Sequence, residues 1–142
     1  MKRSFLILFA ATLFVVTSCC NCASRSREVK PLAGTEWHLV QIMGLDVDKA
    51  ADSYNLLFST DGKVSGVGDC NRLMGSYKTD DKRALDFGAL ASTRMMCPDQ
   101  QSEDEFMDML GRVTHYEMDG DMMLLLSHGE LVAIFKAVPA AE

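Results

Sequence analysis

The chain has 142 residues, with 20 acidic against 14 basic side chains and a formal net charge of −6 when histidine is neutral. It contains no arginine-rich or lysine-rich run, so the basic surface that nucleic-acid binding requires is not expected.

The N-terminal segment has the layout of a secretory signal peptide. Two basic residues are followed by an apolar run over residues 5–16 and by a small polar pair before Cys19. The run is about a dozen residues long, whereas a membrane-spanning helix needs roughly 20. We therefore expect residues 1–18 to be a cleaved signal rather than a retained anchor.

The segment VTSC, residues 16–19, resembles the bacterial lipobox, in which the signal peptidase cuts before a cysteine that carries a diacylglyceryl group. Cys19 is then the site of lipid attachment and the first residue of the mature chain. Modification of Cys20 instead would place Thr17 where the motif prefers a branched apolar side chain such as Val16. An ordinary secreted protein whose cysteine happens to follow the signal is the other interpretation. A lipoprotein cysteine carries several acyl chains, which together anchor a protein stably in the membrane. A single acyl chain gives only marginal membrane binding.

Cleavage before Cys19 would leave 124 residues, 12 of them basic and 20 acidic, with a net charge near −8. This length fits one domain with one hydrophobic core. Residues 19–33 lack hydrophobic periodicity and are expected to form a flexible lipid-anchored tether. The domain is expected over residues 34–138, followed by a short tail at 139–142.

Short apolar segments, separated by glycine and aspartate, follow the tether. The alternation in TEWHLVQI places Trp37 and Leu39 on the same face of a strand. The close spacing of such segments predicts a mainly β fold, an antiparallel sandwich or a small barrel. The expected strands are residues 35–42, 54–59, 63–68, 75–79, 83–90, 114–118, 122–127 and 131–137.

One helix is expected over residues 98–113. Ser102 with Glu105 fits a capping box, and Asp99 is an equally suitable cap. The acidic residues 103–105 come early, where the helix dipole favours negative charge, so we expect a solvated helix start rather than a metal site. The apolar face is formed by Phe106, Met109, Leu110 and Val113.

Three stretches in this order, GTEWHLVQIMG, GDCNRLMGSY and ASTRMMCPDQQSEDEFMDML, resemble the META domain, also called the heat-shock HslJ-like family. The family pattern runs Trp-x-Leu, then Gly-x-Cys-Asn with a following Gly-x-Tyr, then Thr-x-Met-x-Cys before an acidic helix. Asp69 departs from this pattern, because many members have a small residue there. The matching residues are Trp37, Leu39, Cys70, Asn71, Gly75, Tyr77, Thr93, Met95 and Cys97.

The resemblance covers about residues 34–137 and implies a small antiparallel β-barrel with one helix packed at its end. It places the chain among bacterial proteins that are often envelope lipoproteins, some of them linked to heat shock and to tolerance of the antibiotic novobiocin. It implies no reaction, because the family has no established catalytic activity.

Cys70 and Cys97 are the two cysteines of the expected domain, and close cysteines of an exported protein usually pair. Their disulfide would close a loop of about 28 residues and stabilise the fold by about 3 to 4 kcal/mol through chain entropy. The alternative is a redox or nucleophilic Cys97, whose thiolate the helix dipole would favour. Against that alternative, the spacing is not Cys-x-x-Cys, and no motif ties a histidine to either thiol. The histidines are His38, His115 and His128.

No metal or other cofactor is expected. Cys20 and Cys22 are the only closely spaced cysteines apart from the neighbouring Cys19, and no partner pair at zinc-finger spacing follows them. They lie in the expected tether as extra thiols that can pair with each other or with a neighbouring chain.

The methionines allow two interpretations. Most are expected to pack in the core, where their flexible side chains fill irregular gaps. The functional interpretation is that Met74, Met95 and Met96 line an apolar mouth at one end of the barrel. Met95 and Met96 cannot both face inward on a strand, so one of them is expected to be exposed. Asn71, in a Gly-rich turn, is expected to maintain the fold first and to bind a ligand second.

These features favour a non-enzymatic bacterial envelope lipoprotein, a monomeric binding or scaffold module linked to envelope stress or antibiotic tolerance. No Asp follows Cys19, so we expect the outer membrane, with the domain facing the periplasm. The expected partners are the membrane through the lipid, other envelope proteins, or a small apolar ligand at the barrel mouth. Alternative functions are a carrier of a small hydrophobic ligand and a thiol-redox protein that uses Cys97 and Cys70.

Overall fold

The computed structural model describes residues 28–48 and 52–138. The expected signal peptide, Cys19 with its neighbouring cysteines, and the tail at 139–142 lie outside this range. Within it, the chain forms ten strands and one helix. They are β1 (Glu36–Ile42), β2 (Leu45–Asp46), β3 (Asn55–Phe58), β4 (Lys63–Val67), β5 (Arg72–Thr79), β6 (Leu85–Phe87), β7 (Ala91–Ser92), α1 (Gln100–Gly111), β8 (His115–Asp119), β9 (Met122–Ser127) and β10 (Glu130–Val138).

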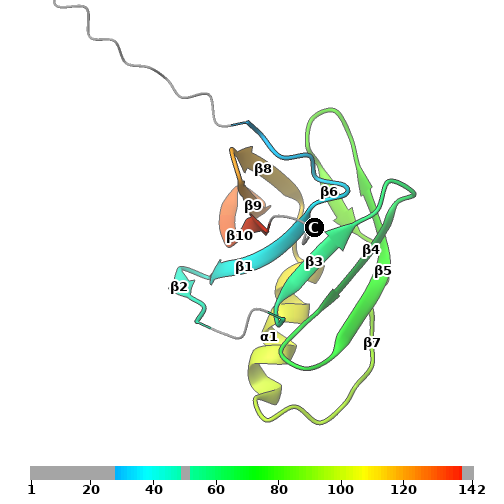
Figure 1. Ribbon diagram of the computed structural model, residues 1–142, viewed down its shortest axis with the longest axis vertical. Coiled ribbons are helices and arrows are strands. Elements are labelled where there is room, and N and C mark those ends of the chain that lie inside the picture. The colour runs from blue at the N-terminus through cyan, green and yellow to red at the C-terminus, as the bar shows by residue number, and fades with distance from the viewer. Residues whose placement is uncertain (1–27, 49–51, 139–142) are drawn as a thin grey trace, which may run out of the picture.

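The strands form one curled antiparallel sheet in the order β6-β5-β4-β3-β1-β10-β9-β8 (Figure 1). The short strands β2 and β7 lie off this path and pair with β1 and β5. The two ends of the curl approach each other at a single bridge between Ala84 and His115. There the backbone N–H of Leu85 donates to the carbonyl of Thr114 at 2.9 Å. The predicted mainly β, barrel-like single domain is confirmed.

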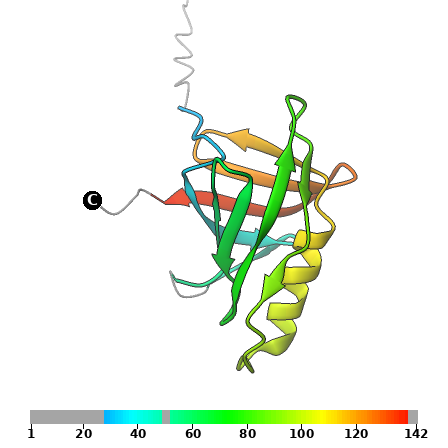
Figure 2. The same ribbon diagram turned by 90° about the vertical axis from the view of Figure 1, so that its right-hand side faces the viewer.

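The helix packs along one side of the curled sheet (Figure 2). Its Phe106 ring lies 5.1 Å from the Tyr54 ring and 6.4 Å from the Phe135 ring, measured between centroids. From the sheet, Trp37 and Leu39 point into the same core, as the alternation predicted. The space between sheet and helix is therefore filled by the protein's own side chains. The largest fully buried ones are Trp37, Phe58, Phe106, Phe135, Leu56, Leu73, Leu85, Met109, Leu110, Met123, Leu125 and Val64.

The helix is shorter than the predicted range 98–113. It begins after Asp99, whose Oδ1 accepts the backbone N–H of Ser102 at 3.1 Å, so the cap is Asp99 and not the Ser102–Glu105 box. It ends because Val113 donates to the carbonyl three residues back, at Leu110, which tightens the last turn. Among the described residues, no helix has the length and apolar character required to cross a membrane.

Candidate functional site

Cys70 and Cys97 form a disulfide, with their Cα atoms 5.7 Å apart. The bond joins the turn after β4 to the irregular segment that runs from β7 into α1, here called the 93–97 segment. The predicted pairing is confirmed, and with it the expectation that the bridge ties the start of the helix to the Gly-rich turn.

Asn71 is the second link between the turn and the 93–97 segment. Its side chain is 1% exposed and makes four hydrogen bonds across this junction. The amide nitrogen donates to the carbonyl of Met95 at 3.2 Å and to Sγ of Cys97 at 3.1 Å. The amide oxygen accepts from Oγ1 of Thr93 at 2.9 Å and from the backbone N–H of Met95 at 2.5 Å. All hydrogen-bonding capacity of this amide is spent on holding the segment.

Glu103 is the third link. Its carboxylate is 3% exposed, and Oε2 accepts the backbone N–H groups of Asp69 at 2.6 Å and Cys70 at 3.2 Å. Gly68 makes room for it, since a Cβ there would lie 2.5 Å from both carboxylate oxygens. The expectation that residues 103–105 are solvated holds for two of them and is wrong for Glu103. Glu103 lies three residues before Phe106, on the helix face that packs against the sheet.

Tyr54 closes the same cluster from the side of β3. Burial raises the pKa of its hydroxyl well above the ordinary value of 10.0. The neighbouring Asp69 carboxylate raises this pKa further, and a hydrogen bond with Ser102 acts in the opposite direction. Asp69, which departs from the family pattern, therefore makes two contacts in this cluster. Its backbone N–H donates to Glu103, and its side chain interacts with Tyr54.

A cavity of about 650 Å³ opens between the 93–97 segment and α1, on the outer side of these links. Met95 and Met96 do not lie on a strand, and both are exposed, at 54% and 97%, so the expectation that the two do not both face inward is met. Met74 on β5 is 60% exposed and pairs with Ala91, which lines the cavity. Of the three methionines of the predicted mouth, Met95 and Met96 therefore line the cavity, and Met74 lies on the neighbouring strand without lining it. The full lining is Asn71, Leu90, Ala91, Ser92, Arg94, Met95, Met96, Gln100, Glu103, Asp104 and Met107.

Four other residues of the predicted motif lie in or against the core and not at the cavity. Trp37 is fully buried, and its Nε1 donates to the carbonyl of Leu32 at 3.0 Å, while Leu39 packs beside it. Tyr77 donates its hydroxyl to the carbonyl of Ser59 at 2.9 Å. Gly75 allows a close strand crossing, where a Cβ would lie 2.7 Å from the carbonyl oxygen of Ala89.

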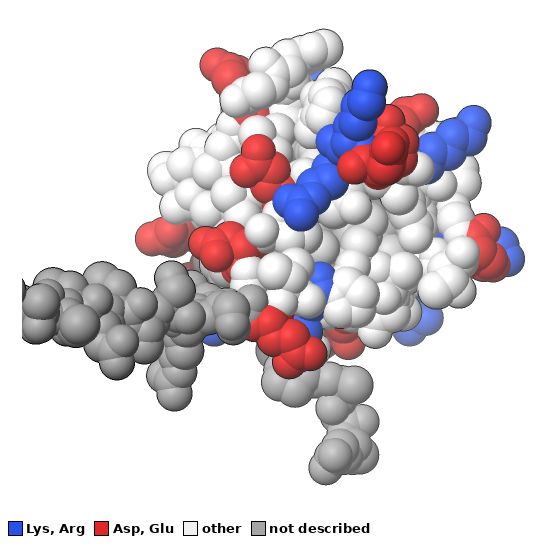
Figure 3. Space-filling model, turned by 90° about the horizontal axis from the view of Figure 1, so that it is seen from above, with Lys and Arg blue, Asp and Glu red and all other residues white. Residues whose placement is uncertain are grey.

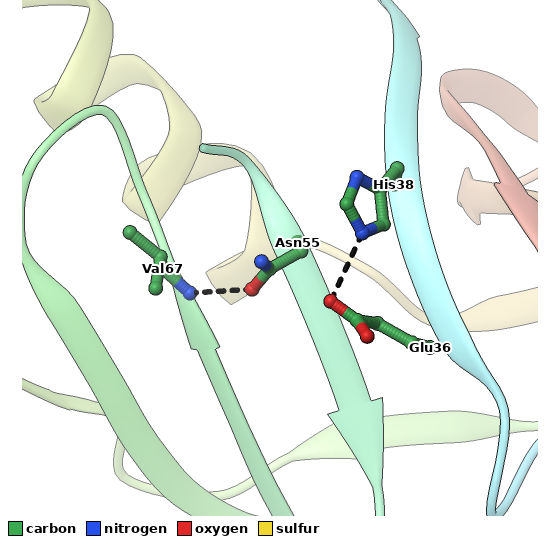
Figure 4. A network of polar contacts seen from close by, with 4 residues as sticks. All are labelled: Glu36, His38, Asn55 and Val67. Carbon is green, nitrogen blue, oxygen red and sulfur yellow. Dashed lines mark hydrogen bonds and ion pairs between the residues drawn. The ribbon is translucent and has the colours of Figure 1, made fainter. Parts of the chain in front are cut away.

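Two of the three histidines, His38 and His115, have side-chain contacts away from the disulfide. Nε2 of His38 lies 3.0 Å from Oε1 of Glu36, both on β1. Figure 4 shows this contact near the hydrogen bond from the Val67 N–H to Oδ1 of Asn55, which is 3.0 Å long. Nδ1 of His115 lies 3.1 Å from Oγ1 of the adjacent Thr114. Within the described part of the chain, no group of three or more His, Cys, Asp and Glu side chains is arranged to hold a metal ion.

Charges of both signs are interspersed on the face shown in Figure 3, where acidic and basic side chains lie next to each other. This pattern matches the absence of a basic run in the sequence. That face offers no continuous basic surface for a polyanion.

Comparison with known proteins identifies the family of this chain and solved structures with a similar fold. The model of the family described as META domain matches residues 30–139. An NMR structure of a protein from Burkholderia xenovorans is 30% identical, with a TM-score of 0.58, over 75% of this chain and 83% of that one. A second NMR structure is 23% identical, with a TM-score of 0.60, over 74% of this chain and 90% of that one. The crystal structure of a DUF4847 family protein from Bacteroides vulgatus ATCC 8482 shares the fold at 18% identity, with a TM-score of 0.57, over 78% and 96% of the two chains. A search of curated proteins gave no match.

Proposed function

The chain belongs to the META domain family, and we propose that it is a bacterial envelope lipoprotein whose domain is a binding module and not an enzyme. The observation that carries the proposal is the exposed methionine surface beside the cavity, built on a segment that Asn71, Glu103 and the disulfide hold in place. Soft, flexible thioether side chains on a fixed backbone suit adaptable recognition of an apolar group.

The polar groups under the cavity support a binding role over a catalytic one. A general base or nucleophile needs a free lone pair that substrate can reach, but the Asn71 amide is fully used by the 93–97 segment, and Oε1 of Glu103, which has no hydrogen-bond partner among the described residues, is buried. Oε2 of Glu103 lies 3.8 Å from Sγ of Cys97. A disulfide sulfur has no hydrogen to donate, so this is a contact and not a bond. After reduction, the adjacent carboxylate would disfavour a thiolate at Cys97, which weakens the thiol-redox alternative.

The arrangement of the fold supports display of the cavity away from the membrane. In Figures 1 and 2 the first described residues enter at one end of the molecule, and the loop before α1 lies at the other. The expected tether, residues 19–33, is shorter than predicted, because Lys30 donates its backbone N–H to Gly120 and Ala33 bridges Phe58. With a lipid on Cys19 and a tether before Lys30, the 93–97 segment would face the periplasm, where other envelope proteins are within reach. In this role the protein supports tolerance of envelope stress or of antibiotics.

A second candidate is a carrier of a small hydrophobic ligand. The filled core argues against a ligand inside the barrel. The outer cavity of about 650 Å³ is, however, within the size range of small-molecule sites. A carrier would therefore hold its ligand between the 93–97 segment and α1.

The test combines intact mass with in-cell cross-linking. The mass of the protein extracted from its own membranes is expected to include diacylglycerol on Cys19. A photo-reactive amino acid at position 96 is expected to cross-link an envelope protein or an apolar compound, whereas the same group at Met43, also exposed, is not. An unacylated protein, or equal cross-linking from both positions, would contradict the proposal.

A further inference from the structure

Thioether sulfur is concentrated at one place on this protein. Met95, Met96 and Met107 line the cavity beside α1. Met74 faces the same side, because directly paired residues of antiparallel strands project to one face and its partner Ala91 lines the cavity. Three of the ten methionines in the chain thus line a single opening, and Met74 lies on the strand beside it. The exposure of Met96 and Met95, at 97% and 54%, shows that core packing does not account for them.

The charge of the cavity favours a cation. The carboxylates of Glu103 and Asp104 line it against the single guanidinium of Arg94. Oε1 of Glu103 is buried and has no hydrogen-bond partner among the described residues. No ion pair within 4.0 Å neutralises this carboxylate in that part of the chain. A buried carboxylate oxygen without a partner is costly, and a cation nearby would offset the cost.

We propose that the cavity binds a soft monovalent cation, Cu(I), through the thioether sulfurs of Met95, Met96 and Met107, with Met74 at its border. Thioether and thiolate donors select Cu(I), whereas Mg²⁺ and Ca²⁺ require oxygen ligands and Zn²⁺ prefers thiolate and imidazole. Because Cys70 and Cys97 are joined, thioethers are the soft donors that remain at this place. The inference deepens the proposed function and rests on it, since it names the ligand of the same binding face.

The backbone of the segment is suited to such a site. The Asn71 side chain hydrogen-bonds to both the N–H and the carbonyl of Met95, and the disulfide fixes the backbone at Cys97. Between these two points each methionine side chain keeps three rotatable bonds. The sulfurs can therefore adjust to an ion without movement of the main chain, which lowers the ordering cost of binding.

The test is a competition titration on the protein purified from its own membranes, in detergent, with the Cys70–Cys97 disulfide intact and any free thiol at Cys20 or Cys22 alkylated beforehand, because thiolates would also capture Cu(I). Cu(I) is supplied anaerobically as its bicinchoninate complex, and loss of the chelator's colour reports transfer to the protein. We expect one equivalent to transfer. Met96→Leu, Met95→Leu and Met107→Leu should each weaken binding roughly tenfold or more. Met43→Leu, which removes an exposed methionine elsewhere, should have no effect.

The outcomes separate this inference from the proposed function. Leucine keeps the apolar volume, so the fold, followed by the fluorescence of the single tryptophan, and any apolar contact should survive the substitutions. If no copper transfers while position 96 still cross-links a partner, the copper inference is overturned and the binding module stands. If copper transfers equally to the Met43→Leu and Met96→Leu variants, the ion binds adventitiously and the inference is also overturned. X-ray absorption at the copper edge must show sulfur neighbours, since oxygen or nitrogen ligands alone would contradict the site.

Discussion

Replacement of Glu103 by alanine should destabilise the domain far more than its place on an acidic helix start suggests. The substitution leaves the N–H groups of Asp69 and Cys70 without their acceptor at a part-buried position. An unsatisfied buried donor costs about 1 to 3 kcal/mol, so two predict a loss of about 2 to 6 kcal/mol in the free energy of unfolding. Glu103→Gln keeps one acceptor oxygen but loses the charge, and about 1 to 3 kcal/mol is expected.

The assay is equilibrium unfolding in urea with the disulfide intact, followed by the fluorescence of Trp37. This residue is the only tryptophan and is fully buried, so its emission reports loss of the core. The matched control is Glu105→Ala, two residues along the same helix, where the side chain is exposed and bonds only to Gln101. It should cost about 0.5 kcal/mol or less. If Glu103→Ala and Glu105→Ala unfold at the same urea concentration, the carboxylate does not hold the turn and the reasoning fails.

Three further predictions use the same unfolding measurement. Asn71→Ala should lower the free energy of unfolding by about 2 to 4 kcal/mol, and Asn55→Ala by about 1 kcal/mol. The reason is that the Asn71 side chain makes four hydrogen bonds and that of Asn55 accepts one. Equal losses for the two variants would refute this difference in role. Gly68→Ala should destabilise strongly, because its Cβ would lie 2.5 Å from a buried carboxylate, whereas Gly111→Ala meets nothing within 4 Å and should gain up to about 1 kcal/mol. Because the pKa of Tyr54 is raised, the folded state keeps the hydroxyl proton while the unfolded state releases it near pH 10. The contribution of this hydroxyl to the free energy of unfolding is therefore present below that pH and is lost above it. Tyr54→Phe should therefore flatten the alkaline fall in stability, and an unchanged pH profile would show that the hydroxyl is not the group responsible.

The sequence predicted the parts of the fold that depend on local pattern. Alternation placed Trp37 and Leu39 in the core, and spacing of 3.6 residues placed Phe106 on the buried face of the helix. The cysteine pair followed from the redox state expected of an exported chain, with no need for geometry. Each of these inferences uses information held within about ten residues or within the composition.

The missed features depend on contacts between distant segments. β2 and β7 have two residues each, too few for any periodic signal, and exist because β1 and β5 offer a free edge beside them. The sequence pattern predicts a solvated Glu103, because acidic residues are common at helix starts. Its place three residues before Phe106 and seven before Leu110, on the apolar face, was the signal that could have identified it.

The conformation of Arg94 supports the view that the exposed segment is shaped for binding. Its φ of 53° is in the left-handed region, which costs a residue with a side chain about 1 to 2 kcal/mol. Asn71 bonds to the residues on both sides, Thr93 and Met95, and these bonds offset the strain at the residue between them. Between residues of the described ranges, the hydrogen bonds that hold the segment use neither the side chain of Arg94 nor that of Met96. The residues that hold the segment in place are therefore not the residues whose side chains it exposes to the cavity. Substitutions at positions 94 and 96 can for this reason alter what the cavity binds without altering the fold.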